Sequence, residues 1–200
     1  MEPINQLTAL ACPLPLENVD TDQLIPARFM KEPRLPRGYG DFLLHDMRFD
    51  RSGSPADFVL NRPGMDQASI LVARRNFGAG SSREAAVYAL VDFGFRCVVA
   101  PGFGDIFASN AVNNGLLPAQ VSEPDAERLL AQLEAGEARL SVNLDAQTVG
   151  AGDVVVGFDI NPTWRLKLLN GWDDIDLTLA KSKDIEAFRA GYLRAFPWLG

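Results

Sequence analysis

Short apolar runs alternate with helical patterns through the middle of the chain, and this alternation constrains the fold more than any other feature. Residues 70–73 and 97–100 form uninterrupted apolar runs, which are typical of strands buried on both faces. Between them, apolar residues recur at helical spacing over 85–93. Asp105 is expected to N-cap a second helix, and a short strand is expected at 116–121. Strands separated by helices predict a parallel sheet with right-handed crossovers.

The flanks of this unit predict additional strands that run antiparallel. A first strand is expected over 7–11. Apolar and polar residues alternate over 140–144 and 154–158, which predicts half-buried antiparallel strands. Ser122 is expected to cap a helix before them, and a last helix is expected over 185–192. The sheet should therefore be mixed.

The 200 residues are expected to form one domain, spanning 1–200, with a three-layer α/β architecture. An irregular stretch at about 30–58 contains several Gly and Pro residues. A loop of this length inside a compact domain is typically functional or disordered. It carries Arg34 and Arg37 just after Arg28, in a chain that is otherwise acidic.

The formal net charge of -7 argues against nucleic acid and anionic membranes as partners, because both require a basic face. A small acidic substrate stays compatible, since a local group of arginines can oppose the overall sign. With no secretory signal and no membrane-length apolar run, the chain is expected in the cytoplasm. Cys12, Cys97 and His45 are too few to ligate zinc or an iron–sulfur cluster, so no metal site is expected in this chain.

A glycine-rich turn at 78–84 joins the first buried run to its helix and contains two hydroxyls and an arginine. The first N–H groups of a helix have no intrahelical partner and, with the helix dipole, favour negative charge. Glycines let a ligand approach the backbone closely. We therefore expect this turn to bind a carboxylate, with Arg83 as a bidentate clamp. The alternative is a capped helix whose hydroxyls are incidental.

Two of the longest motifs, at residues 18–29 and 76–84, resemble segments of the small subunits of 3-isopropylmalate dehydratase, relatives of the swivelling C-terminal domain of aconitase. The resemblance runs nearly end to end. It implies a swivelling β/α domain with a mixed sheet. Further segments that carry it are residues 40–49, 105–107, 114–118, 170–171 and 174–175.

The resemblance also implies roles for individual residues. Ser81 would be the alkoxide base, Arg83 would hold a substrate carboxylate, and Ser82 would assist it. The reaction would interconvert 2-isopropylmalate and 3-isopropylmalate by dehydration and rehydration, in leucine biosynthesis. Other substrate contacts are expected from Asp20, Thr21, Asp22, Arg28, Arg34 and Arg37. The residue types leave alternatives open: an Asx-turn at 20–22 and a surface salt bridge for Arg28.

A larger partner subunit is a further implication of the resemblance. A 4Fe-4S cluster on that subunit would act as Lewis acid toward the departing hydroxyl, while this chain supplies the base and part of the substrate clamp. The chain would then be active only when it is assembled with its partner.

Three positions depart from the usual family pattern. Ala79 stands where Cys is usual, Ala85 where His is usual, and Leu166 where His is common. The presumed base and clamp are retained, but the residues around them are not. These departures leave open a paralogous dehydratase subunit for a related acid, such as methylmalate or a homologue of citrate, and a non-catalytic binding or assembly module.

Overall fold

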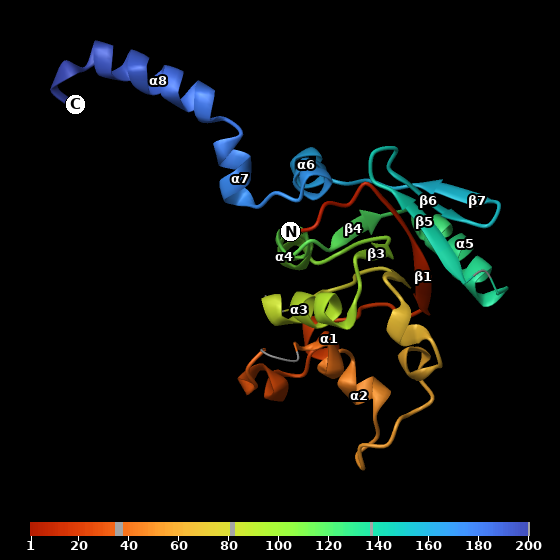
Figure 1. The fold of residues 1–200 in the computed structure, drawn as a ribbon. Coiled ribbons are helices and arrows are strands. Elements are labelled where there is room, and N and C mark those ends of the chain that lie inside the picture. Colours follow the sequence, from red (N-terminus) through yellow and green to blue (C-terminus); the bar gives the residue numbers. More distant parts are fainter. Residues whose placement is uncertain (35–37, 81–82, 137, 200) are drawn as a thin grey trace.

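A seven-stranded mixed sheet forms the centre of the protein in a computed structural model that describes residues 1–34, 38–80, 83–136 and 138–199 (Figure 1). The strand order is β4-β3-β2-β1-β5-β6-β7. Strands β1 to β4 pair in parallel, and β5 to β7 join the other edge in antiparallel pairs, which confirms the predicted mixed sheet. The strands are β1 (Gln6–Leu14), β2 (Ile70–Ala73), β3 (Cys97–Ala100), β4 (Leu117–Gln120), β5 (Arg139–Asn143), β6 (Thr148–Ala151) and β7 (Val154–Gly157).

Helices α3, α4 and α5 follow the parallel strands in the predicted order. Ser122 caps α5 through its hydroxyl, which accepts from the N–H of Asp125 at 3.2 Å, as expected. The α-helices are α1 (Thr21–Leu24), α2 (His45–Arg48), α3 (Glu84–Phe93), α4 (Asp105–Asn113), α5 (Glu123–Glu134), α6 (Pro162–Asn170), α7 (Asp174–Leu179) and α8 (Ser182–Ala195). The 3-10 helices are η1 (Ala27–Lys31), η2 (Gly40–Phe42), η3 (Val59–Asn61), η4 (Met65–Gln67) and η5 (Pro197–Leu199).

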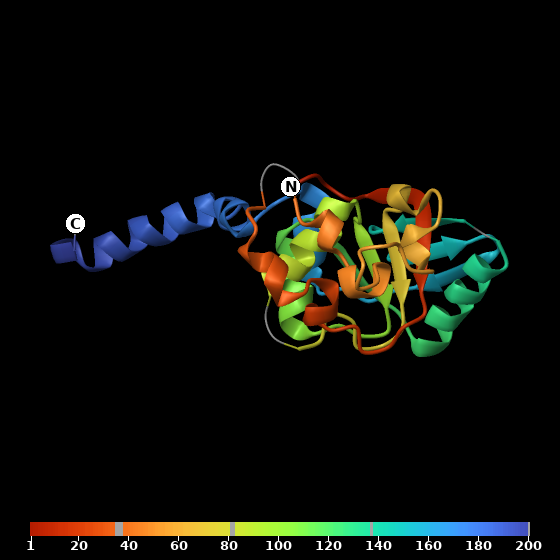
Figure 2. The same cartoon turned by 90° about the horizontal axis from the view of Figure 1, so that it is seen from below.

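Two hydrophobic cores lie on opposite faces of the parallel strands, so the body has three layers. Successive strand residues face opposite sides of a sheet. Accordingly Leu71 and Val98 belong to the core that includes α3, whereas Val72 and Val99 belong to the core that includes α5. Both layers around the sheet are visible in Figure 2. This burial on both faces explains why β2 and β3 are uninterrupted apolar runs.

The structure differs from the sequence-based expectations in several elements, among them helices α1, α2, α6 and α7, which were not predicted. Strand β1 is longer than predicted, because its first half pairs with β5 and residues 11–14 pair with β2. Strand β6 was not predicted; it forms the middle of the β5–β6–β7 meander. The expectation that Asp105 caps α4 is wrong by one residue, since Gly104 is the N-cap and Asp105 is the first helical residue.

The last two helices form an arm that projects from the body. Helix α6 lies against the sheet domain, and α7 then leads to α8, which extends away from the other elements (Figures 1 and 2). The predicted C-terminal helix is confirmed and is longer than the expected 185–192. No helix in the described part of the chain is long and apolar enough to cross a membrane.

Candidate functional site

The segments that follow β1, β2 and β3 meet at one edge of the sheet. Parallel strands bring their carboxyl ends to the same edge, where open α/β sheets bind ligands. Gly78 donates its N–H to the carbonyl of Val19 at 2.7 Å, and Thr21 donates to the carbonyl of Ala79 at 3.0 Å. The two segments singled out in the sequence, 18–29 and 76–84, are therefore joined by backbone hydrogen bonds.

The segment after β3 closes the other side of the glycine turn. Phe77 donates its N–H to the carbonyl of Gly102 at 2.9 Å, and Gly104 donates to the carbonyl of Phe77 at 3.0 Å. Residues 77–80 thus run between the segments that follow β1 and β3. Such a turn is held on both sides by backbone contacts, which makes its position insensitive to side-chain motion.

Two glycines allow this close approach. A Cβ at Gly78 would overlap the ring of Phe107, and the residue has a φ of +70°, in the left-handed region. A Cβ at Gly104 would lie 2.5 Å from the carbonyl oxygen of Gly78. Only glycine fits at both positions without displacing the turn or α4. The glycines of this motif are therefore required by packing as well as by any ligand.

A cavity of about 180 Å³ opens at the junction of these segments. Pockets that bury drug-sized ligands are typically about 300–1,000 Å³, so this cavity is a small one. Arg83 is the N-cap residue of α3, and Gly104 is that of α4, so the N-termini of both helices border the cavity. Their N–H groups favour an anionic ligand. The cavity is lined by Thr21, Gly78, Gly80, Arg83, Gly104, Asp105, Ile106 and Phe107.

Arg83 forms an ion pair with Asp22, the second acidic residue of the 20–22 turn. The Arg83 side chain is 20% exposed and that of Asp22 is 58% exposed, so the carboxylate side of the pair faces solvent. Asp20 instead caps α1: its side chain accepts from the N–H of Gln23 at 2.7 Å, and the Gln23 side chain accepts from the N–H of Asp20 at 2.9 Å. This capping box rigidifies the turn that holds Asp22 beside Arg83.

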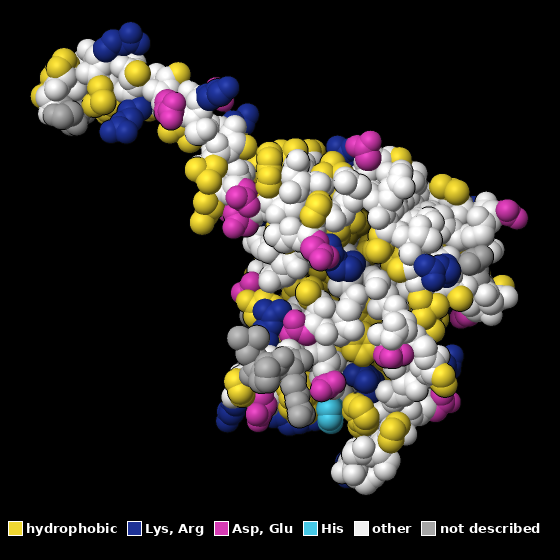
Figure 3. Space-filling model, in the orientation of Figure 1, with side chains coloured by type: hydrophobic (Ala, Val, Ile, Leu, Met, Phe, Trp, Pro, Cys, Tyr) yellow, Lys and Arg dark blue, Asp and Glu magenta, His cyan; other side chains and the backbone are white. Residues whose placement is uncertain are grey.

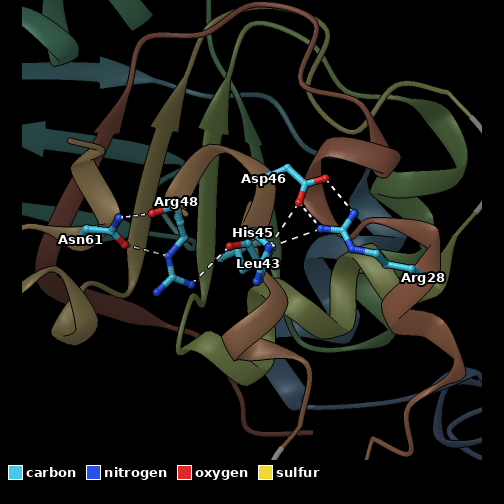
Figure 4. Close-up of polar contacts among 6 residues, drawn as sticks. All are labelled: Arg28, Leu43, His45, Asp46, Arg48 and Asn61. Atoms are coloured by element: carbon cyan, nitrogen blue, oxygen red, sulfur yellow. Dashed lines mark hydrogen bonds and ion pairs between the residues drawn. The ribbon is translucent and has the colours of Figure 1, made fainter. Parts of the chain in front are cut away.

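Arg28 lies in a separate cluster from Arg83. Both terminal nitrogens of Arg28 donate to the carboxylate of Asp46, and the distance from Nη1 to Oδ2 is 2.9 Å. His45 lies beside this pair (Figure 4). The hydrogen bond from Arg28 lowers the pKa of Asp46 to about 2. The structure thus gives Arg28 the surface salt bridge that its sequence context left open, with Arg28 54% exposed.

The loop around this cluster is held to its surroundings by further polar contacts. Arg48 donates to the side-chain oxygen of Asn61 at 3.2 Å and to the carbonyl of Leu43 at 3.3 Å (Figure 4). The ring of His45 packs at 4.6 Å from that of Phe29. These contacts order residues 43–48, in the middle of the expected substrate loop, and Arg28 is not part of the cavity lining.

Arg34 is bound to helix α3 and does not line the cavity. It donates to the two carboxylate oxygens of Asp92 at 2.9 and 2.7 Å, and its guanidinium lies 3.8 Å from the ring centroid of Tyr88. Burial opposes ionisation of Asp92, but the hydrogen bonds from Arg34 and the N–H of Tyr39 hold its pKa below the usual value. Arg34 therefore anchors the loop to α3 in this structure.

Ser81, Ser82 and Arg37 lie outside the described residues. Among the other candidates, the structure brings Thr21 and Arg83 together at the cavity, with Asp22 paired to Arg83. Arg28 and Arg34 instead form ion pairs with Asp46 and Asp92, which do not line the cavity.

Four residues that line the cavity were missed as site residues. Gly104, Asp105, Ile106 and Phe107 form the entry to α4. The rule that ligands bind beyond the carboxyl ends of adjacent parallel strands could have identified them, because β3 neighbours β2. Ile106 adds an apolar side chain, 54% exposed, next to that of Phe107 in the cavity lining.

No group of three or more His, Cys, Asp or Glu residues in the described ranges is placed to hold a metal ion. Cys12 and Cys97 are both buried and unpaired. Burial raises the pKa of Cys12 to about 12, and it raises that of Cys97 further. The two thiols belong to the cores on opposite faces of the sheet, so they cannot ligate one cluster together.

Comparisons with known proteins match three parts of the chain to family models. Residues 1–124 match the aconitase C-terminal domain, residues 127–162 match LeuD_N, and residues 174–200 match the C-terminal domain of the 3-isopropylmalate dehydratase small subunit. The 3-isopropylmalate dehydratase small subunit of Rhodospirillum centenum is 46% identical, covering 99% of this chain and 98% of its own length. That of Parvibaculum lavamentivorans is 44% identical and covers 100% of both chains.

A solved structure gives the same fold. The crystal structure of 3-isopropylmalate dehydratase from Methanocaldococcus jannaschii aligns with a TM-score of 0.64. It covers 92% of this chain and 99% of its own, at 22% sequence identity. At this identity the likeness concerns the fold, and it supports the three-layer arrangement described above.

Proposed function

Because the chain belongs to the family of 3-isopropylmalate dehydratase small subunits, we propose that it is the small subunit of a hydro-lyase that interconverts 2-isopropylmalate and 3-isopropylmalate. The enzyme removes water from one isomer and returns it at the neighbouring carbon, a step of leucine biosynthesis. One observation carries this proposal: the backbone pairing of the 20–22 and 78–80 turns places Arg83 at a small cavity bordered by two helix N-termini.

The first role proposed for this site is to bind a substrate carboxylate. The guanidinium of Arg83 has donors arranged in a fixed fork that matches a carboxylate. Its ion pair with Asp22 holds the side chain in place before substrate arrives. The N-termini of α3 and α4 add positive potential. These groups would stabilise the negative charge that grows on the carboxylate as the adjacent carbon loses its proton.

The second role is proton transfer by Ser81, which is assigned from the resemblance. As an alkoxide, Ser81 takes the proton from the carbon next to the carboxylate, and a double bond forms as hydroxide leaves the adjacent carbon. That hydroxide and the proton on Ser81 together make up the water that is removed. Rehydration reverses these steps with the hydroxyl added to the other carbon, and Ser81 returns its proton. In the sequence, Ser81 stands two residues before Arg83, the N-cap residue of α3, and the N-terminus of a helix favours a negatively charged group such as an alkoxide.

The third part of the proposal is the partner. The relatives that this chain matches are named small subunits, and the described residues include no group of side chains that could ligate a cluster. A large subunit is therefore proposed to complete the site and to carry a 4Fe-4S cluster, which supplies Lewis-acid chemistry toward the departing hydroxyl. This chain contributes the carboxylate clamp and the base.

A second candidate keeps the reaction and changes the acid. Ala79 lies in the glycine turn between Gly78 and Gly80, which both line the cavity, so a residue change there is next to the cavity wall. A smaller or differently branched acid, such as a methylmalate or a homologue of citrate, would suit an altered wall. The non-catalytic module is the remaining alternative.

The test is reconstitution with the large subunit under anaerobic conditions. Ser81→Ala should abolish turnover of isopropylmalate while leaving the unfolding transition of the small subunit unchanged, because a turn hydroxyl adds little to stability. Arg75→Lys is a matched control, since Arg75 pairs with Glu17 on the surface. A panel of hydroxy acids would separate the two candidate substrates. Full turnover by Ser81→Ala, or none by the native pair with any acid, would contradict the proposal.

A further inference from the structure

Helix α8 leaves a complete apolar face uncovered. Ile185, Phe188 and Tyr192 recur at helical spacing and are 48, 71 and 44% exposed. No residue of α8 is buried in the described chain, and the helix packs extensively only on the short η5 that follows it. Isolated helices of this length are marginal in water. The arm is therefore a surface that another molecule must cover for the helix to be stable.

The exposed face is aromatic and continuous. The rings of Phe188 and Tyr192 lie 5.7 Å apart, those of Tyr192 and Phe196 lie 4.9 Å apart, and those of Phe196 and Trp198 lie 5.5 Å apart. Trp198 is 75% exposed. Hydrophobic side chains are visible along this arm in Figure 3. Contiguous exposed apolar patches commonly mark protein interaction sites. Aromatic side chains in such patches are typical hot spots of binding energy.

We propose that this aromatic face of α8 and η5 docks into an apolar groove of the large subunit and tethers the two chains. The inference rests on the proposed subunit role. It goes beyond that role by assigning the tether to the arm and by separating it from the substrate site.

The family matches favour the large subunit as the occupant. Residues 1–124 match a domain described as C-terminal in aconitase, so there it is joined covalently to the rest of its chain. Residues 174–200, which contain the arm, match a domain described for the separate small subunit. A domain that loses its covalent link also loses the high effective concentration that the link provides. The arm restores that contact without a peptide bond.

The root of the arm lies away from the cavity. Lys167, only 4% exposed, donates its ammonium protons to Asn113 at 2.5 Å and to Asp174 at 2.7 Å, which fixes the start of α7 to the C-terminal end of α4. The cavity is at the opposite end of α4, at Gly104. Helix α4 has 9 residues and therefore spans about 13 Å between these two points. The arm can therefore hold the large subunit while the cavity stays open to the partner's catalytic face.

A second copy of this chain fits the arm less well. Outside the arm, the large apolar side chains exposed on the described body are those of Met1, Met30, Ile106, Val155 and Leu166, which belong to five different segments of the chain. Pairing of two α8 helices would give only two heptads, whereas stable coiled coils need about three or four.

A membrane surface also fits poorly. Membrane-binding helices are rich in Lys and Arg on their polar face. Helix α8 carries Lys183, Arg189 and Arg194 together with Asp184 and Glu186, and the whole chain has a net charge of -7. Its polar face is thus nearly balanced in charge.

The test is isothermal titration calorimetry, in which the purified small subunit is titrated into the large subunit and the dissociation constant is measured. The double variant Phe188→Ala with Tyr192→Ala should raise the dissociation constant of the complex by about 30-fold or more, as expected when two aromatic hot-spot residues are removed. The control Lys183→Ala with Arg194→Ala changes the opposite face of α8 and should stay within about twofold of the native value. Turnover per assembled complex, measured at saturating small subunit, should be retained in both.

Three results would overturn the tether. One is an unchanged dissociation constant in the aromatic variant. The others are arm-dependent dimers of the small subunit alone in light scattering, and arm-dependent sedimentation with vesicles that contain anionic phospholipid. Arm-dependent binding without activity toward any acid would refute the proposed reaction and leave the tether standing, so the two failures are distinguishable.

Discussion

The cavity edge and the C-terminal arm differ in how tightly their residues are packed. At the cavity edge, backbone hydrogen bonds on both sides of residues 77–80 and glycines at van der Waals contact leave no freedom. In α8, the large apolar side chains are exposed and touch mainly one another. A clamp for a carboxylate must be rigid before the ligand arrives, whereas a docking surface must stay uncovered until its partner arrives.

Among the residues that the structure describes, the largest effect is expected at Arg83. Arg83→Lys keeps the charge and removes the bidentate fork, so kcat/KM for isopropylmalate in the reconstituted enzyme should fall by about 100- to 1,000-fold. Steady-state kinetics would measure this. The same substitution at Arg75, on the surface, should leave the kinetics unchanged. Equal losses in both variants would mean that the cavity edge is no more sensitive than the surrounding surface.

Glycine substitutions compare the two regions directly. Gly78→Ala places a Cβ against the ring of Phe107 at a φ of +70° and should lower the free energy of unfolding by about 2–4 kcal/mol. Gly191→Ala in α8 meets no atom within 4 Å and improves helix propensity, so it should cause no loss. Urea unfolding of the small subunit would give both values. A similar loss at both positions would contradict the contrast.

The loop anchored to α3 should have an intermediate effect. Arg34→Ala removes two hydrogen bonds and a ring contact, and it should cost about 1–2 kcal/mol of folding free energy. Because the pKa of Asp92 is lowered in the folded state, the pair stabilises the fold above the unfolded pKa of Asp92. That stability is lost as the pH falls through the folded value. The difference between native and Arg34→Ala midpoints should therefore shrink on acidification.

The smallest effect on the fold is expected from removing the arm. Deletion of residues 182–200 takes away a helix that buries no side chain in the described body, so the free energy of unfolding should change by less than about 0.5 kcal/mol. Thermal unfolding followed by near-ultraviolet circular dichroism at body residues would show it. A large drop in the midpoint would mean that the arm packs on the body in solution.

Most of the fold could be predicted from local pattern. The apolar runs at 70–73 and 97–100, the helix between them and the cap at Ser122 all depend on near neighbours in the chain. Strand β1 was predicted too short, because its second half is specified by pairing with β2 rather than by its own alternation. Pairing between distant segments leaves little trace in a local pattern.

The candidate site was predicted only in part for the same reason. The glycine turn and Arg83 were recognisable as residue types in order. The partners of Arg28 and Arg34, namely Asp46 and Asp92, could not be found from the sequence, because any nearby carboxylate could have served.

The sequence by itself determined the order of strands and helices from β2 to α5, the glycine turn before α3 and the amphipathic character of α8, since each follows from periodicity and residue chemistry. The tertiary structure decided which segments meet. The 20–22 turn lies beside residues 78–80, the start of α4 lies at the cavity, and α8 projects away from the sheet domain. Periodicity shows that a face is apolar, but what covers that face depends on the distances that only the folded chain establishes.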